Sequence, residues 1–300
     1  MVADSVRQKT LKSAIRCRGV GLHSGVTVNL VLRPAELDSG IRFRRSDLGL
    51  EIPARYDCLA DATLCTTLAA AGATAQTVEH LLAAFAGLEV DNALVEIDGP
   101  EVPAMDGSAA PFVFLIERAG LIEQDAPRRA IKILKPVRVK GQGKTASLEP
   151  GDGFSLSLSI DFVSGAIRRQ QITVSPDPEG FKRDICRART FGFLEEVESM
   201  RAAGLARGGS LANAVVISGD RVLNAEGLRY GDEFVRHKVL DAMGDLYLAG
   251  GPIIGHFRGQ RSGHALNRLL LERLFADPTA WCHATLPVAE AWEEPRRARA

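Results

Sequence analysis

The chain has 300 residues, of which 37 are basic and 37 acidic, so its formal net charge is zero. This balance argues against a nucleic-acid partner, and no apolar run approaches the about eighteen residues that a membrane-spanning helix needs. The length exceeds one small core and favours two domains. The N-terminus lacks the apolar segment of a secretory signal, and the five cysteines include no CxxC pair. Both features predict a cytoplasmic protein without disulfides.

Alternating and periodic apolar residues predict strands and helices in the first 120 residues. Three strands follow the apolar–polar alternation of a half-buried sheet, at 27–34, 40–46 and 92–98. Two helices are expected over 74–88 and 108–120. Ser108 is suited to begin the second helix as its N-cap, and Gly120 is suited to end it.

The pattern of strands starts again near residue 130. The polar segment "IEQDAPRRA" (122–130) contains Pro127 and predicts a linker. After it, "AIKILKPVRVKGQGKTASLEPGDGFSLSLSIDF" repeats the order of features in "TLKSAIRCRGVGLHSGVTVNLVLRPAELDSGIRF": a lysine, a glycine turn, an alternating strand, then a proline and a further strand. We therefore expect two copies of one α+β unit, at 1–125 and 130–300, although short matches of this kind can also arise by chance.

The helices of the two halves match as well. Residues 78–88 align with 235–245 without a gap, so that His80 meets His237. Each helix has a stripe of apolar residues at helical spacing, and we expect this stripe to pack against the core of its own half. The stripe consists of Val78, Leu81, Leu82, Phe85 and Leu88 in the first helix, and of Val235, Val239, Ala242, Met243 and Leu246 in the second. Both histidines lie opposite these stripes, and that of the first helix lies beside small residues, which let a second backbone come close. The two faces are expected to meet between the domains.

His237, Asp241 and Asp245 lie four residues apart and therefore on one line of the second helix. Such a His–Asp pair can bind a metal ion or form an ordinary hydrogen bond on a wet surface. With His80 from the first helix, His237 and Asp241 would form the three-ligand set of a catalytic zinc site, which leaves one position for water. Glu79, next to His80, would be the base for that water.

Three further segments contain residues that could carry chemistry. "RSGHALNRLLLERLF" places His264 at the start of a helix, where Asp245 could keep its ring protonated, or where it could simply cap the helix. "RARTFGF" includes Thr190, which is either a donor to an oxyanion or part of an ordinary strand end. "GVGLHSG" holds His23 in what is either a backbone nest for an anion or a tight hairpin.

Taken together, these segments resemble a known enzyme family. Six segments are similar to blocks of the zinc-dependent UDP-3-O-acyl-N-acetylglucosamine deacetylases, which catalyse the committed step of lipid A synthesis in Gram-negative bacteria. They are "GVGLHSG", "TVEHLLAAFAGLEVDN", "MDGSAAPF", "RARTFGF", "DEFVRHKVLDAMGDL" and "SGHALN". The blocks occur in the family's order between about residues 9 and 275. The resemblance implies hydrolysis of the N-acetyl group of UDP-3-O-acyl-N-acetylglucosamine, which gives UDP-3-O-acyl-glucosamine and acetate.

The resemblance also implies a fold and a cofactor. The family has two similar βααβ-type domains with the active site between them, and each domain carries an insert. Here the inserts would lie near 45–67 and 160–175, and the second would hold the acyl chain. The cofactor would be Zn²⁺, although Fe²⁺ suits similar ligands. A cytoplasmic monomer without a membrane span is expected, and its partner is the nucleotide sugar rather than nucleic acid.

Carried over residue by residue, the resemblance assigns roles to individual positions. The zinc ligands would be His80, His237 and Asp241. The catalytic residues would be Glu79 as general base, His264 as general acid, Asp245 to keep His264 charged, and Thr190 to assist at the oxyanion. The substrate would contact Lys238 through its diphosphate and glucosamine, Phe191 through the sugar, Phe162 through the uracil, and also Arg261 and His23.

Two positions depart from the family's pattern, and two other functions stay open. Arg261 replaces a frequent lysine, which keeps the charge but changes its geometry, and Glu196 replaces a commoner aspartate. A metal amidohydrolase for a different nucleotide sugar or acyl amide would share most of these residues. A non-catalytic zinc or nucleotide-sugar binding protein would not need Glu79 and His264 beside the ligands.

Overall fold

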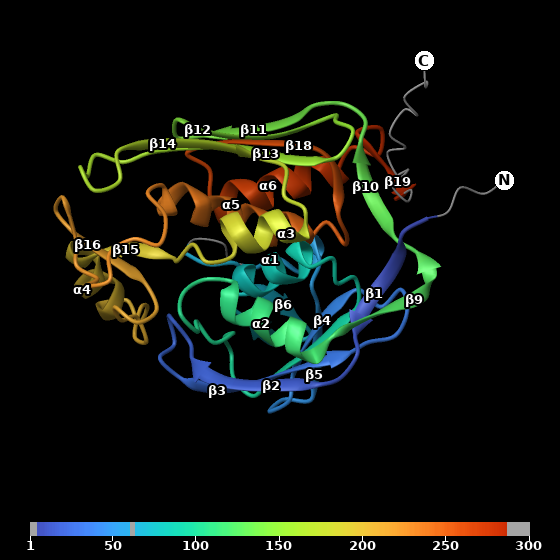
Figure 1. Ribbon diagram of the computed structural model, residues 1–300, viewed down its shortest axis with the longest axis horizontal. Helices are drawn as coiled ribbons and strands as arrows, with labels where there is room; N and C mark the ends of the chain where they lie inside the picture. The colour runs from blue at the N-terminus through green and yellow to red at the C-terminus, as the bar shows by residue number, and fades with distance from the viewer. Residues whose placement is uncertain (1–4, 61–63, 287–300) are drawn as a thin grey trace, which may run out of the picture.

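The computed structural model describes residues 5–60 and 64–286. Two β-sheets form its outer layers, and the main helices lie between them (Figure 1). Each sheet buries one face against the helices, so its strands alternate between buried and more exposed residues, as β3 (Thr27–Pro34) does along most of its length. The structure confirms the three strands predicted in the first half.

The first sheet has five strands in the order β2-β3-β8-β4-β5. Besides β3, they are β2 (Ile15–Val20), β8 (Ala93–Ile97), β4 (Ile41–Arg45) and β5 (Leu50–Pro53). β8 is antiparallel to β3 and parallel to β4, so that Val95 lies opposite Leu32 on one side and Phe43 on the other. All three side chains are fully buried, which places the middle of this sheet in the core.

The second sheet repeats this arrangement. Its corresponding strands are, in spatial order, β11 (Val137–Gly141), β12 (Lys144–Glu149), β18 (Ile253–Gln260), β13 (Phe154–Asp161) and β14 (Arg169–Val174). β18 is antiparallel to β12 and parallel to β13, so that Phe257 lies opposite Leu148 and Leu156. The order and the directions of these strands are those of the first sheet.

An antiparallel pair of strands accompanies each sheet. The pairs are β1 (Arg7–Leu11) with β9 (Leu121–Pro127), and β10 (Arg129–Ile133) with β19 (Trp281–Thr285). The first pair forms a sheet of its own, whereas β10 also pairs in parallel with β18, so the second pair extends the second sheet to seven strands. The linker predicted at 122–130 is therefore wrong, because most of that segment is strand β9, where Glu123 lies opposite Lys9. The segment is polar because several of its side chains are exposed, and not because it is irregular.

Helices fill the space between the sheets. They are α1 (Glu79–Gly87), α2 (Ala110–Ala119), α5 (Glu233–Tyr247) and α6 (His264–Phe275). α1 packs against α5, and both the apolar stripes and the opposite faces of these two helices are buried, as expected of helices enclosed in a core. Gly120 ends α2 as predicted, with a φ of 74°, whereas the N-cap is Ala109 and not Ser108.

The helix predicted over 74–88 begins later than expected. Ala73–Ala75 forms β7, which pairs with β6 (Leu68–Ala70). Thr77 then has a φ of 55°, in the left-handed region that an α-helix cannot contain. The Thr77 hydroxyl donates to the carboxylate of Glu101 at 2.8 Å, which holds this turn. The helix therefore starts abruptly, with Glu79 as its first residue.

A smaller unit lies at one end of the molecule, on the left in Figure 1. It joins β15 (Phe191–Phe193), α4 (Leu194–Ala202), β16 (Val215–Ser218) and β17 (Arg221–Val222). The remaining elements are α3 (Pro178–Gly180), a π-helical turn (Phe181–Ile185) and a 3₁₀ turn (Tyr56–Cys58). The segment 160–175, predicted as the second insert, spans the end of β13, its turn and β14. Residues 61–63 of the first predicted insert lie outside the described residues.

Two global expectations can be compared with the structure. All five cysteines are free thiols, which confirms the absence of disulfides: Cys17, Cys58, Cys65, Cys186 and Cys282. Within the described residues, no helix combines the length and the apolar character needed to cross a membrane.

Candidate active site and metal centre

The centre of the molecule depends on the close approach of α1 and α5. A Cβ atom added at Gly244 would overlap the backbone carbonyl of Glu79, so only glycine allows the two helices to come this close. On α1, a Cβ atom at Gly87 would overlap the ring of Phe181 instead. The contact between α1 and α5 brings the polar faces of the two helices together, as their small residues predicted.

His80, His237 and Asp241 form one buried group between these helices. Their potential ligand atoms all lie within 4.8 Å of one another. Oδ1 of Asp241 lies 3.2 Å from Nε2 of His237 and 3.6 Å from Nε2 of His80, and the two imidazole rings stand edge to face with their centroids 5.0 Å apart. The three side chains converge on one small space, as the helical spacing predicted.

The donor set fits a zinc ion. Oδ1 of Asp241 is buried and has no hydrogen-bond partner among the described residues, which is costly unless a cation binds there. Nδ1–H of His237 donates to the Ala188 carbonyl at 3.0 Å and leaves Nε2 directed at the group, the usual arrangement around a metal-binding histidine. Two imidazole nitrogens and one carboxylate oxygen are ligands typical of catalytic zinc sites.

The charge states of these residues also suit a cation. Burial lowers the pKa of His237 to about 3, so its ring is neutral and able to ligate. For Asp241, burial alone would raise the pKa, but the interactions of its carboxylate with the His237 imidazole and the Lys238 ammonium lower it well below its usual value. The group therefore presents one carboxylate with a neutral imidazole beside it.

Glu79 lies next to this group on the first turn of α1. One of its oxygens, Oε2, accepts the backbone N–H of Thr66 at 3.1 Å, and the other lies 3.8 Å from Nε2 of His264. Burial raises the pKa of Glu79, although the positive charges of His264 and His80 oppose the shift. A carboxylate with a raised pKa is suited to accept a proton near neutral pH.

His264 begins α6, as predicted, and Asp245 holds its ring. Nδ1 of His264 lies 2.8 Å from Oδ2 of Asp245, and the same oxygen accepts the side-chain amide of Asn267 at 2.8 Å. Burial would lower the pKa of His264, but the carboxylates of Asp245, Glu79 and Asp241 raise it to about 9. The ring is therefore protonated at neutral pH, and Nε2 faces Glu79.

An aromatic group and a lysine border the candidate metal site. The Phe191 ring stands edge to face with that of His237, with centroids 6.3 Å apart, and Phe162 packs against Phe191 at 5.7 Å. Nζ of Lys238 donates to Oδ2 of Asp241 at 2.7 Å and lies 5.6 Å from the centre of the Phe191 ring. Three of the predicted substrate contacts are thus side by side.

The other predicted residues lie in neighbouring segments. Thr190 precedes Phe191, and its backbone is bonded to Gly107 and Val215. His23 is buried, its Nδ1 accepts the backbone N–H of Ala206 at 3.4 Å, and burial lowers its pKa. Arg261 is exposed, three residues before His264. Within residues 5–60 and 64–286, no hydrogen bond or ion pair joins the Thr190 or Arg261 side chain to the metal-binding group.

Several buried polar residues around the site were missed in the sequence. Arg189 and Glu233 form an ion pair at 2.8 Å, with side chains 2% and 0% exposed, that ties the segment before β15 to the start of α5. Glu101 accepts the backbone N–H groups of His23 and Ser24 and so fixes that loop. These residues lie in turns or at helix ends, where no periodicity marks a buried charge.

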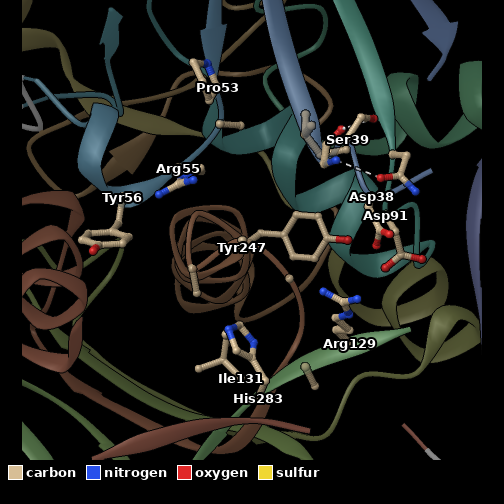
Figure 2. A pocket seen from close by; sticks show the side chains of 18 of the residues that line it. Asp38, Ser39, Pro53, Arg55, Tyr56, Asp91, Arg129, Ile131, Tyr247 and His283 are labelled. Carbon is tan, nitrogen blue, oxygen red and sulfur yellow. Dashed lines mark hydrogen bonds between the residues drawn. The ribbon is translucent and has the colours of Figure 1, made fainter. Parts of the chain in front are cut away.

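A cavity lies elsewhere in the molecule. It has a volume of about 480 Å³, and its lining includes none of the candidate site residues. Figure 2 shows Tyr247, at the end of α5, between Arg55 and Arg129, with Asp91 near its hydroxyl. The lining comes from β1, β10 and β19, from the segments 38–41, 53–56 and 91–92, and from the ends of α5 and α6. This cavity is therefore separate from the buried His–His–Asp group.

Comparison with known proteins agrees with this site. The sequence profile of the family described as "LpxC: UDP-3-O-acyl N-acetylglycosamine deacetylase" matches residues 8–276. Proteins named UDP-3-O-acyl-N-acetylglucosamine deacetylase are 53% identical in Nitrosococcus oceani, 52% in Pseudomonas entomophila and 51% in Stenotrophomonas maltophilia, each over 92% of this chain and 92% of the relative. A family match of this extent, on a fold that brings the predicted ligands together, leads to one conclusion: the chain belongs to the LpxC family of deacetylases.

Proposed function

We propose that this chain hydrolyses the N-acetyl group of UDP-3-O-acyl-N-acetylglucosamine at the site between α1 and α5. Membership of the LpxC family assigns the chain to this deacetylation, a step of lipid A biosynthesis. The observation that supports the assignment of the site is the convergence of His80, His237 and Asp241 beside two proton-transfer groups. We also propose the family's cytoplasmic location and a monomeric state.

His80, His237 and Asp241 would hold the zinc ion. When bound, zinc acts as a Lewis acid and lowers the pKa of water towards about 7. Glu79 accepts the proton of the attacking water as the new C–O bond forms. Protonated His264 then donates its Nε2 proton to the leaving nitrogen as the C–N bond breaks, which yields the free amine and acetate. Asp245 keeps the His264 ring charged and oriented until that transfer.

The remaining predicted residues receive roles from where they lie. The Thr190 hydroxyl would donate to the oxyanion, since Thr190 adjoins Phe191, whose ring borders His237. Lys238 would contact the diphosphate and glucosamine, Phe191 the sugar and Phe162 the uracil. Arg261 and His23 would also contact the substrate, Arg261 from its exposed position three residues before His264 and His23 from its buried position in the loop that Glu101 holds.

We propose that the acyl chain binds where the β13–β14 turn meets the unit containing β15 and α4. The turn is tied to this unit by Ser164, whose hydroxyl donates to the Gly219 carbonyl at 2.7 Å. Large apolar side chains are exposed on both sides of this contact, namely Val163 on the turn and Leu194 and Leu211 on the unit. These side chains would supply the apolar surface that binds the hydrocarbon.

The two halves are proposed to be domains that arose by duplication, 1–125 and 130–300, with the active site at their interface. The repeated strand order and strand directions of the two sheets support this proposal. So do the matched positions of His80 on α1 and His237 on α5. Since the β4–β5 and β13–β14 hairpins correspond, the unit at 191–222 is the part of the second half without a counterpart in the first.

Replacement of Glu79 by glutamine tests this mechanism. Glu79→Gln removes the base but not a zinc ligand, so we expect full zinc content and a loss of turnover of about 10²-fold or more, the usual contribution of a general base. Glu117→Gln, on the exposed face of α2, is the matched control and should retain full activity. Undiminished turnover by Glu79→Gln would contradict the role of Glu79 as general base. If the zinc-loaded wild-type protein did not hydrolyse UDP-3-O-acyl-N-acetylglucosamine, the proposed substrate would be wrong.

A further inference from the structure

Thr66 contacts both groups to which proton transfer is assigned. Its side chain is buried and lies between the start of α1 and the middle of α5. Its backbone N–H donates to Oε2 of Glu79 at 3.1 Å, and its hydroxyl donates to Oδ1 of Asp245 at 2.5 Å. One residue therefore binds the carboxylate of the general base and the carboxylate that orients the general acid.

The hydroxyl of Thr66 completes the support of Asp245. Oδ2 of that carboxylate accepts from His264 and Asn267, each at 2.8 Å, and Oδ1 accepts from Thr66. With both oxygens bonded, the carboxylate cannot rotate without losing a hydrogen bond. Since the hydroxyl has one proton and gives it to Asp245, its oxygen can only accept from Nδ1–H of His264, which is 3.2 Å away. The imidazole is thus held by two acceptors on the same side.

The backbone of Thr66 is itself fixed. Its carbonyl accepts the N–H of Val78, the N-cap residue of α1, at 3.4 Å, and strand β6 begins two residues later. Its position is thereby set by the start of the helix that carries Glu79. The bond from Thr66 to Oε2 leaves Oε1 of Glu79 as the oxygen nearer to His264.

We propose that Thr66 is a positioning residue, which holds the Glu79 carboxylate and the Asp245–His264 pair in one orientation. The proposal rests on the roles given above to Glu79 and His264. The backbone N–H of Thr66 holds the general base, Glu79, and its hydroxyl holds the pair that contains the general acid, His264. Oε1 of Glu79 and Nε2 of His264, which accept and deliver the protons, are thereby kept 3.8 Å apart. Substrate binding does not depend on the hydroxyl.

The test compares Thr66→Val with Thr66→Ser. Valine keeps the shape and the backbone N–H but removes the hydroxyl, so we expect kcat to fall about 10- to 100-fold, as for the loss of a hydrogen bond to a charged group, with KM nearly unchanged. Serine restores the hydroxyl and should retain kcat within about threefold. Thr67→Val is the matched control, because the Thr67 hydroxyl contacts only Cys65 Sγ, at 3.8 Å, among the described side chains.

Zinc content and thermal unfolding are measured on the same preparations. The proposal is overturned if Thr66→Val keeps kcat within about twofold of wild type, if the serine variant loses as much as the valine variant, or if the loss of kcat merely follows a loss of zinc. Thr66→Ala provides the same comparison should the valine variant not fold. If Glu79→Gln is inactive and Thr66→Val is active, only the role proposed for Thr66 is wrong. If Glu79→Gln is active, the proposed mechanism itself is wrong.

Discussion

Two histidines of the site have opposite pKa shifts. Burial lowers the pKa of His237 to about 3, while that of His264 is raised to about 9. The partner of Nδ1 differs: His237 donates to the neutral Ala188 carbonyl, and His264 faces the carboxylate of Asp245. The same side chain can therefore serve as a neutral ligand in one place and as a charged acid a few ångströms away.

Asp245→Asn tests the charge on His264. The variant keeps the shape of Asp245 but removes its negative charge, which is the largest factor raising the pKa of His264. Since only the protonated ring can donate, activity should fall as the pH rises through this pKa. We expect the alkaline limb of the kcat/KM profile to move to lower pH in the variant, with a loss of rate at neutral pH. An alkaline limb at the wild-type position would contradict the assignment of His264 as the acid.

At the scale of single residues, spacing in the sequence was enough to find the three residues that the structure groups as a candidate metal site. His237 and Asp241 lie one helical turn apart, and the alignment of the two helices supplied His80. Thr66 and Glu101 could not be found in this way. The bond from Thr66 to Asp245 joins residues 179 positions apart, and no local pattern records such a contact.

At the scale of elements, the packing of α1 on α5 sets the geometry of the site. The two helices approach until Gly244 meets the backbone of Glu79, and this brings ligands from both helices within reach of one ion. The sequence predicted both helices and the small residues between them. It did not predict the abrupt start of α1, because the segment from β7 to Thr77 contains no glycine or proline that would mark a break in the helical pattern.

Gly244→Ala tests this packing. The added methyl group must push α1 and α5 apart, so we expect a loss of about 1–3 kcal/mol in the free energy of unfolding, together with weaker zinc binding. Gly141→Ala is the control, since a Cβ atom there would meet nothing within 4 Å. Denaturant unfolding and zinc titration measure both effects. Equal stability and equal zinc affinity in the two variants would show that the close approach is not required.

At the scale of the whole molecule, the candidate zinc ligands come from both halves of the chain. His80 belongs to the first half, and His237 and Asp241 to the second. The repeated strand order was foreseen from the sequence echo, because each half repeats the same alternation and turns. The pairing of β1 with β9 was not, because β1 buries the polar side chains of Gln8 and Thr10 and β9 is largely exposed, so neither strand has a clear apolar pattern.

Metal removal should therefore destabilise the whole fold. A ligand that binds only the folded chain stabilises it by about 4 kcal/mol when its concentration is a thousandfold above Kd. We expect chelation to lower the Tm and zinc to restore it, whereas a chain with Asp241→Asn should respond much less. A Tm that is independent of zinc would contradict a metal bound between the two halves.

Acetate release from UDP-3-O-acyl-N-acetylglucosamine, measured as zinc is titrated into chelated protein, tests zinc-dependent deacetylation at this site most directly. We expect activity to rise in proportion to bound zinc and to saturate at one ion per chain. We also expect His237→Ala to abolish both zinc binding and turnover. Full acetate release by the metal-free chain, or full activity of His237→Ala, would contradict zinc-dependent deacetylation at this site.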